Sequence, residues 1–457
     1  MSPSSAAQHD GLPPARRRLA MFATGLAVAM AVLDGSIANV ALPAIARDLA
    51  VSPAEAVWVV NAYQLTITIL LLPLSSLGDS FGYRRVYGTG LALFTVASLG
   101  CALADSLTTL AVARVIQGIG AAGIMSVNAA LVRHTYPTGQ LGKGVGIIAL
   151  VVAGSAALGP SVAAGILALG PWPWLFTVNL PLGILALALW RALPATPGSH
   201  HPFDTPSALL NAAAFGLFIL AVDGLGHGER PLVVVLEFAG ALAAGILLVR
   251  RELHRPSPLF PVDLLRIPVF ALSISTSVCA FAAQMLAYVA LPFYLQDVLG
   301  LSQVETGLMM TPWPATIALV APIAGRLADR YHSGLLGGIG MAVFAGGLVM
   351  LALLPPDPGP LAIMVRMAVC GLGFALFQSP NNRTIIGSAP MHRSGGASGM
   401  LGTARLTGQT TGTALVAVIF SLFAQQGALF SVAVGAGFAL AAMGASLARL
   451  AGPARER

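Results

Sequence analysis

The chain has 457 residues, of which 56% are hydrophobic and only 9% are charged, and its mean hydropathy is +0.83. Soluble domains carry roughly 25% charged residues, so this composition excludes a soluble globular protein and indicates a chain that crosses a membrane many times. The formal net charge of +7 comes from basic residues scattered singly between apolar runs, a distribution that does not favour nucleic-acid binding.

Stretches long enough to cross a bilayer, about 20 mostly apolar residues each, follow one another along almost the whole chain. We predict fourteen membrane-spanning helices and therefore an all-α integral membrane fold. Their approximate bounds are 19–45, 54–77, 86–104, 108–132, 143–168, 174–193, 206–225, 231–249, 268–292, 304–325, 334–354, 360–382, 396–422 and 428–449. The arginines at 16–18 resemble the start of a signal peptide, but the apolar run after them continues to Ile45, which favours a retained first helix.

The lysine and arginine residues predict the orientation of these helices. With a cytoplasmic N-terminus, nineteen of them fall in inner segments, whereas only Arg47 and Arg230 fall in outer loops. The remaining three, Arg114, Arg366 and Arg405, lie within spans. This bias follows the positive-inside rule, so we expect both termini in the cytoplasm.

Two pairs of segments echo each other along the chain. SLGDSFGYRRV (76–86) resembles IAGRLADRYHS (323–333), and VARVIQGIGAAG (112–123) resembles MVRMAVCGLGFA (364–375). We therefore predict two pseudo-symmetric six-helix halves, with a substrate site between them near mid-membrane. The predicted divisions are an N-terminal tail (1–18), a first half (19–193), a two-helix insertion (206–249), a second half (268–449) and a C-terminal tail (450–457).

Short motifs lie at successive predicted helices of the first half. They include LDGSIANVALP (33–43), WVVNAYQLT (58–66) and WPWLFTVNLPLG (172–183). Further motif residues lie between and within these helices: Asp79, Gly82, Arg84 and Arg85 in a loop, Arg114, Gln117, Gly118 and Gly120 in the fourth helix, and Gly146, Gly159 and Pro160 in the fifth. Together these motifs resemble the major facilitator superfamily, and within it the fourteen-span drug:proton antiporters, over nearly the whole chain.

The resemblance implies a proton-coupled antiporter that exports amphipathic small molecules or drugs by alternating access across the cell inner (plasma) membrane. The proton is then the coupling ion, with no cofactor. The implied gating residues are Asp79, Gly82, Arg84, Arg85, Gly325, Asp329 and Arg330, and the antiporter motif is Gly146, Gly159 and Pro160. A dedicated exporter of one endogenous metabolite, antibiotic or metallophore would share the same fold. We expect a monomer that meets a small-molecule substrate and membrane lipid, and no nucleic acid.

Three acids lie within the predicted spans: Asp34, Asp223 and Glu237. Asp34 is about ten residues from either end of the first span, hence near the bilayer centre. An ionisable group at that depth indicates a functional site. Our hypothesis is that Asp34 loads a proton outside and releases it inside, with Arg114 as its counter-charge. The alternative is a static pair that holds the first and fourth spans together.

Polar residues recur three or four apart within several spans and therefore share a helix face. These polar faces either line a central cavity or form hydrogen bonds between helices, which contribute ~0.6 kcal/mol each. The predicted substrate-binding residues are Asn39, Asn61, Gln64, Gln117, Gln284, Tyr288, Met309, Trp313, Phe377, Gln378, Arg405 and Gln409. With one central acid, this cavity favours a monocationic, neutral or zwitterionic cargo over a dication and leaves an anionic cargo open.

Other chemistry has little support in the sequence. The chain has no His-Glu-x-x-His, and GIGAAG (118–123) lies inside a span instead of a nucleotide-binding loop, so we expect a protein that is not an enzyme. The three cysteines form no motif, and His200-His201 is interpreted as a solvated loop pair and not a metal site.

Overall fold

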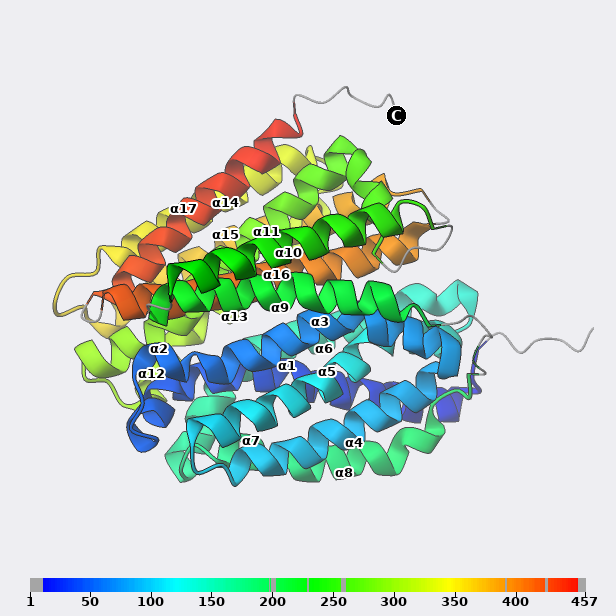
Figure 1. Ribbon diagram of the computed structural model, residues 1–457, viewed down its shortest axis with the longest axis horizontal. Helices are drawn as coiled ribbons and strands as arrows, with labels where there is room; N and C mark the ends of the chain where they lie inside the picture. Colours follow the sequence, from blue (N-terminus) through cyan, green and yellow to red (C-terminus); the bar gives the residue numbers. More distant parts are fainter. Residues whose placement is uncertain are drawn as a thin grey trace, which may run out of the picture.

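The computed structural model describes residues 11–196, 198, 203–227, 230–255, 260–390, 393–423 and 426–450, and within these ranges the chain is helical with no strand (Figure 1). The pair His200-His201, residues 1–10 of the predicted N-terminal tail and all but Leu450 of the C-terminal one lie outside the described residues.

Helices coincide with the predicted spans. The first part of the chain forms α1 (Pro14–Asp48), α2 (Pro53–Ala56), α3 (Trp58–Phe81), α4 (Tyr83–Ala102), α5 (Leu107–Thr135), α6 (Leu141–Leu169), α7 (Trp174–Thr177) and α8 (Asn179–Leu189). Two helices follow, α9 (Thr205–His227) and α10 (Pro231–Glu252). The last part forms α11 (Pro268–Phe293), the π-helical turn η4 (Tyr294–Val298), α12 (Gln303–Met310), α13 (Pro312–Leu327), α14 (Ser333–Ala352), α15 (Pro360–Ser388), α16 (Ser394–Leu422) and α17 (Gly427–Ala448).

Twelve helical segments of the described chain are long and apolar enough to cross a membrane. The predicted fourteen exceeds this number because two helices, α4 and α16, do not reach the same hydropathy. α4 begins with Arg84 and Arg85 in its first turn, and α16 carries Arg405 and Gln409 among many glycines and threonines. Both helices nevertheless have the length of a span and pack within the bundle.

Two helix starts that are 250 residues apart are built in the same way. Ser52 Oγ accepts from the backbone N–H of Glu55 (3.2 Å), and the Glu55 side chain accepts from the Ser52 N–H (2.8 Å). Ser302 and Glu305 form the same reciprocal capping box at the start of α12, with the same distances. Each box satisfies backbone donors that a helix start otherwise leaves free.

The helices form two groups with a hairpin between them (Figure 1). The blue-to-cyan helices α1–α8 lie together, and the yellow-to-red helices from α12 to α17 lie together with α11. The green pair α9 and α10 lies across the boundary, where α9 contacts both α3 and α16.

The two ends of the bundle can be told apart by their contacts. Near the start of α1, Leu12 N–H donates to Thr135 O (3.0 Å) and Arg17 donates to Gln140 (2.9 Å), so α1 begins where α5 ends. We call this end the basal face. At the other end of α1, Trp172 Nε1 donates to Asp48 (2.8 Å), and we call that end the apical face.

The α9–α10 hairpin is fastened at its basal end by Asp204, just before α9. Asp204 accepts from Arg251 (3.1 Å) and pairs with Arg255 (2.7 Å). Burial opposes ionisation of Asp204, but its bonds with Ser207, Arg251 and Arg255 outweigh burial and lower the pKa of this carboxyl below its usual value.

Candidate functional site

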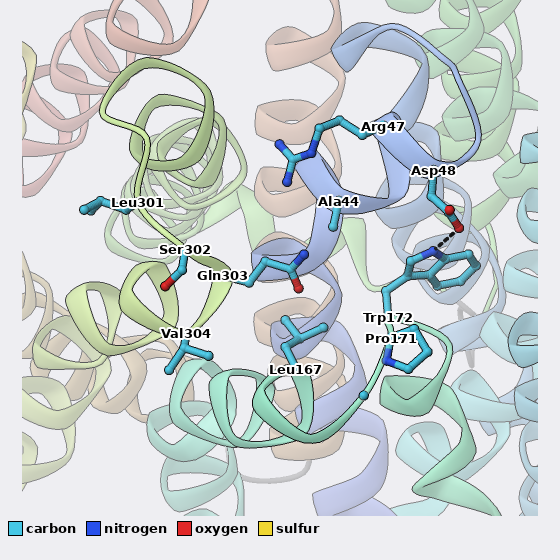
Figure 2. A pocket seen from close by; sticks show the side chains of 11 residues that line it. Ala44, Arg47, Asp48, Leu167, Pro171, Trp172, Leu301, Ser302, Gln303 and Val304 are labelled. Atoms are coloured by element: carbon cyan, nitrogen blue, oxygen red, sulfur yellow. Dashed lines mark hydrogen bonds between the residues drawn. The ribbon is translucent and has the colours of Figure 1, made fainter.

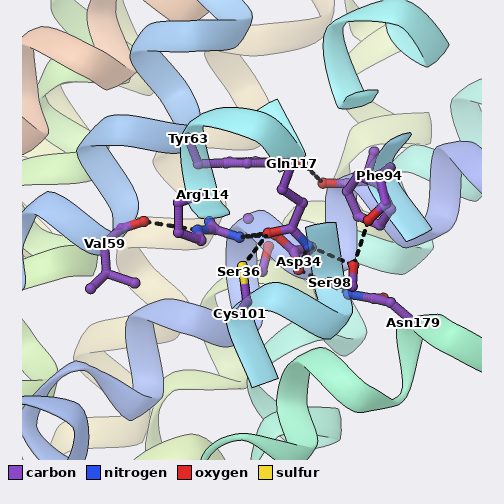
Figure 3. A network of polar contacts seen from close by, with 12 residues as sticks. Asp34, Ser36, Val59, Tyr63, Phe94, Ser98, Cys101, Arg114, Gln117 and Asn179 are labelled. Carbon is purple, nitrogen blue, oxygen red and sulfur yellow. Dashed lines mark hydrogen bonds and ion pairs between the residues drawn. The ribbon is translucent and has the colours of Figure 1, made fainter. Parts of the chain in front are cut away.

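Asp34 lies near the middle of α1 with no exposed surface, and it forms an ion pair with Arg114 of α5, which is equally buried (Figure 3). The structure thus brings together the two residues that the sequence proposes as a proton-coupling pair. Because two charges buried in this way must satisfy each other and their remaining hydrogen bonds, the surroundings of the pair decide what it can do.

Two amides complete the surroundings of the Asp34 carboxylate. Gln117 Nε2 donates to Asp34 Oδ1 (2.9 Å), and Asn179 Nδ2 of α8 donates to the same oxygen (3.0 Å). Gln117 also donates to Ser98 Oγ (2.9 Å) and accepts from Arg114 Nη1 (2.7 Å). The carboxylate therefore connects α1 to α5 and α8, and a change in its charge alters the contacts between these three helices.

The Arg114 guanidinium is held by a carbonyl and by two aromatic faces. Its Nε donates to Val59 O (2.8 Å), and its carbon atom Cζ lies 4.1 Å from the centroid of the Tyr63 ring and 5.5 Å from that of Phe176. Its Nη2 is buried with no hydrogen-bond partner in the described chain. Cation–π attraction from the two rings stabilises a charge that hydrogen bonds satisfy only in part.

A cavity of about 430 Å³ lies beside this network, between the two groups of helices. Seven predicted substrate-binding residues line it: Asn39, Gln64, Gln284, Tyr288, Gln378, Arg405 and Gln409. They come from α1, α3, α11, α15 and α16, so residues far apart in the sequence meet at one concave surface, as a ligand site requires.

Five other predicted substrate-binding residues are not in the cavity lining: Asn61, Gln117, Met309, Trp313 and Phe377. Gln117 belongs instead to the Asp34 network. Trp313 is fully buried behind Tyr288 (ring centroids 5.1 Å apart), and Phe377 is fully buried behind Phe374 (5.6 Å). Substrate binding by these five residues stays a prediction, because helical spacing identifies a face but not which of its residues form the cavity wall and which form the layer behind it.

Tyr63 was not predicted, although it joins the two parts of the site. Its ring lines the cavity and lies over Arg114, and its hydroxyl donates to Ala31 O (2.9 Å). Gly35 and Ser36, next to Asp34 in α1, also line the cavity. The cavity is therefore separated from the buried ion pair by one aromatic ring and by the backbone of α1.

The predicted gating residues of the first half gather on the basal face. Gly82 joins α3 to α4 with φ of +95°, and a Cβ there would lie 2.4 Å from Thr196 O, so both backbone and space require glycine. Asp79 accepts from the Tyr83 hydroxyl, and the Arg84 guanidinium lies 4.7 Å from the Trp190 ring. Arg85 is exposed.

In the second half, Asp329 follows α13 and forms an ion pair with Arg383 of α15, a partner that the sequence did not suggest. Arg330, the neighbouring predicted gating residue, is exposed. A Cβ on Gly325 would have no atom within 4 Å, so packing does not require glycine there.

The antiporter motif lies in α6, where α1 and α12 approach. A Cβ on Gly159 would lie 2.5 Å from Ser36 Cβ, and Gly307 of α12 packs directly on the carbonyl of Pro160. Gly146, by contrast, has no atom within 4 Å of its would-be Cβ. Gly159 thus permits the close contact of α1 and α6, while Gly146 is free of packing constraints.

We predict that Gly159→Ala lowers the stability of the purified protein, because a Cβ at this position overpacks the α1–α6 contact by about 1–3 kcal/mol. Gly146→Ala should leave the melting temperature unchanged or raise it, because alanine favours a helix by up to ~1 kcal/mol over glycine. The double variant Ser36→Gly/Gly159→Ala removes the clashing Cβ and should recover much of the loss. Thermal unfolding followed by tryptophan fluorescence measures all three, and equal stability of the two single variants would refute the packing argument.

On the apical face, α1 and η4 are joined across the two groups of helices. Arg47 pairs with Asp297 (2.6 Å) and donates to Gln296 (3.2 Å), while Gln296 Nε2 donates to Val40 O (2.9 Å). Beside this contact lies a recess of about 730 Å³ between the end of α6 and the start of α12, and Figure 2 shows Gln303 and Leu167 on its walls.

The other two intramembrane acids lie in the α9–α10 hairpin. Trp58 Nε1 donates to Asp223 (2.8 Å), which links the hairpin to the start of α3. Glu237 has one buried carboxylate oxygen with no hydrogen-bond partner in the described chain. Within the described residues, no group of three or more His, Cys, Asp or Glu is placed to hold a metal ion.

Comparison with known proteins agrees with this architecture. Residues 24–413 match the Major Facilitator Superfamily. The chain is 54% identical to the uncharacterized transporter YebQ of Escherichia coli (strain K12), over 98% of both chains. It is 32% identical to the riboflavin transporter RibZ of Clostridioides difficile (87% of this chain, 86% of the relative) and 30% identical to the multidrug efflux pump LfrA of Mycolicibacterium smegmatis (90% and 82%).

Solved structures show the same fold at low sequence identity. A crystal structure of a POT family transporter in complex with a thioalcohol-conjugated peptide is similar with a TM-score of 0.73 at 15% identity, covering 95% of this chain and 96% of the other. A crystal structure of a bacterial homolog of the human lysosomal transporter Spinster has a TM-score of 0.67 at 16% identity, covering 96% of both chains.

The structure is a bundle of apolar helices around a buried ion pair and a polar cavity, and its relatives are transporters. These findings define a membrane transporter and not an enzyme. The chain belongs to the Major Facilitator Superfamily. The family resemblance seen in the sequence is thereby confirmed, and the relatives include multidrug resistance proteins and drug efflux pumps, in keeping with the drug:proton antiporter type.

Proposed function

We propose that this transporter is a proton-coupled antiporter that exports small amphipathic molecules by alternating access. The observation that carries the proposal is the Asp34–Arg114 pair, fully buried at the middle of α1 and separated from the central cavity by the ring of Tyr63. An acid in this place can exchange a proton with either side only when the surrounding helices move.

The neighbours of the pair suggest how its charge acts on the helices. A proton on Asp34 removes the anion that Arg114 pairs with, while Arg114 keeps its bonds to Val59 O and Gln117. The link between α1 and α5 is then weakened and α1 can shift. Because Gly35 and Ser36 of α1 line the cavity, a shift of α1 changes the substrate site.

Alternating access needs contacts that close one face and can be broken. On the apical face, Arg47–Asp297 and the Gln296–Val40 bond join the two groups of helices. Ser161 and Thr311, 2.7 Å apart, add a contact between α6 and the junction of α12 and α13. In this proposal the apical face is the external one, since the basic residues favour a cytoplasmic basal face in the inner membrane.

The proposal includes two pseudo-symmetric halves and fourteen spans, with α4 and α16 crossing the membrane alongside the twelve more apolar segments. The matched capping boxes at Ser52 and Ser302 support the repeat. So does helix packing: a Cβ on Gly118 would press on Tyr63 O, and one on Gly371 would press on Trp313 O, which lies 250 residues after Tyr63. We expect the protein to act as a monomer, because each half contributes to one cavity within a single chain.

The breadth of substrates separates two versions of this function. LfrA is named a multidrug efflux pump, and a further relative, Stp of Mycobacterium tuberculosis, is named a multidrug resistance protein, whereas RibZ is named a riboflavin transporter. The cavity has several uncharged amide side chains and apolar walls, which suit varied amphipathic ligands and favour the broader version. A dedicated exporter of one compound is the alternative.

The test is transport in proteoliposomes under an imposed pH gradient, combined with growth protection of a pump-deficient host against dyes, quaternary amines, antibiotics and metabolites. We expect transport to stop when an ionophore collapses the pH gradient. Protection against several unrelated compounds supports the multidrug version, and protection against one supports the dedicated version. Efflux that is indifferent to the pH gradient would refute proton coupling.

A further inference from the structure

The central cavity carries one positive charge with no counter-charge. Among the described residues that line the cavity, Arg405 of α16 is the only charged one, and none is an aspartate or a glutamate. Throughout the described chain, Arg405 forms neither an ion pair nor a side-chain hydrogen bond, and its Nε is buried without a partner.

Two arginines that are more deeply buried than Arg405 are differently placed. Arg114 pairs with Asp34, and Arg449 at the end of α17 donates to Asn381 Oδ1 (2.8 Å) and Ser273 Oγ (2.9 Å). A cation removed from bulk water without such partners is costly to maintain. The Arg405 guanidinium, with a buried Nε that has no partner among the described residues, is therefore available to a ligand.

Asp34 does not supply that partner. Its carboxylate has no exposed surface, and it is already neutralised by Arg114 and bonded to Gln117 and Asn179. The ion pair as a whole adds no net charge beside the cavity, so the net charge of the described lining is that of Arg405.

The remaining wall offers hydrogen bonds and apolar contact. Asn39 Oδ1 and Gln64 Oε1 are buried without partners, which leaves two amide oxygens free to accept hydrogen bonds from a ligand, while the amide nitrogens donate to Gly35 O and Met285 Sδ. The aromatic residues of the lining are Tyr63, Phe281, Tyr288 and Phe374. A ligand that fits both parts of the wall has an acidic group for Arg405 and a planar apolar body for the rings.

We propose that the substrates of this transporter are amphipathic organic acids, bound as anions through Arg405. The proposal rests on the exporter function argued above and names its substrate class. This substrate class differs from the monocationic, neutral or zwitterionic cargo that the sequence favours. The reason is that Asp34 is neutralised by Arg114, whereas Arg405 lines the cavity.

Equilibrium binding of two dyes tests the proposal without any proton gradient. Fluorescein is an anion and rhodamine 123 is a cation, and both have the same xanthene ring. In nanodiscs of neutral phosphatidylcholine, we expect the wild type to bind fluorescein more tightly than rhodamine 123, as measured by fluorescence polarisation. Arg405→Gln should weaken fluorescein binding by about tenfold to a hundredfold, and Arg405→Lys by less.

The matched control is Arg366→Gln. Arg366 lies in α15 and is absent from the cavity lining, and it donates to the carbonyls of Met350 and Ala362, both at 2.9 Å. This variant should bind both dyes as the wild type does. The proposal is overturned if the wild type binds fluorescein no more tightly than rhodamine 123, or if monodisperse Arg405→Lys and Arg405→Gln both keep wild-type affinity for fluorescein. Because no gradient is present, these results are independent of whether transport is coupled to protons.

Discussion

Asp34→Asn is expected to abolish transport driven by a pH gradient, while the exchange of labelled for unlabelled substrate at equal pH continues. The asparagine side chain keeps an oxygen that can accept from Gln117 and Asn179, but it cannot gain or lose a proton. The cavity, which Asp34 does not line, keeps its substrate contacts. Loss of gradient-driven transport together with retained exchange separates a proton-coupling residue from one that only supports the fold.

Two controls sharpen this result. Asp34→Glu keeps a carboxylic acid on the same helix and should retain part of the gradient-driven transport. Glu237→Gln removes a different intramembrane acid, one with a carboxylate oxygen that has no hydrogen-bond partner in the described chain. It should leave coupling intact because Glu237 lies in the α9–α10 hairpin and is not in the cavity lining. If Asp34→Asn still accumulates substrate in response to a pH gradient, Asp34 is a static partner of Arg114 and the coupling hypothesis fails.

The fold could be predicted from the sequence because its signal is carried by composition. Apolar runs of span length leave few alternatives, and every predicted segment coincides with a helix. α4 and α16 have a lower hydropathy than the other segments for a physical reason. α4 has two arginines at its basal end, and α16 carries Arg405 and Gln409, which both line the cavity. A helix that faces a polar cavity needs less apolar surface than one that faces lipid.

The pairing of Asp34 with Arg114 could also be predicted, since few charges lie within spans and a carboxylate at the bilayer centre is costly without a counter-charge. Which polar residues reach the cavity could not. Gln117 is drawn into the buried network by Asp34, and Trp313 packs against Phe344 (5.4 Å between ring centroids) in the layer behind the wall. Tyr63 was missed because an aromatic residue in an apolar helix has the same signal in the sequence whether it packs in a core or shields a cation.

An anionic cargo changes the energetics of exchange. One proton entering and one anion leaving move two elementary charges in the same electrical direction, and each contributes about 2.3 kcal/mol per 100 mV of membrane potential. A proton on Asp34 also leaves Arg114 without its anion, and a free cation near the cavity would attract the anion that is to be released. Antiport of an organic acid therefore requires that Arg114 stay shielded from the cavity, as it is beneath the ring of Tyr63.

Arg114→Gln is expected to lower the free energy of unfolding by about 3–5 kcal/mol, the second of the two large effects that the buried pair predicts. The substitution leaves a carboxylate with no exposed surface and without its cation, and it also removes the bond to Val59 O that links α5 to α3. Thermal unfolding of the purified protein measures the loss, and Arg366→Gln is the control for replacing an intramembrane arginine.

The double variant Asp34→Asn/Arg114→Gln decides whether the loss comes from the ion pair. With both charges removed, no buried charge is left unpaired, so the double variant should be more stable than Arg114→Gln alone, and the two single effects should not add. A double variant whose destabilisation equals the sum of the single effects would mean that Asp34 and Arg114 act independently, which contradicts the structure. A purely structural pair could be replaced by two neutral side chains without loss of transport. If the double variant folds but shows no transport driven by a pH gradient, the pair is therefore needed for coupling as well as for stability.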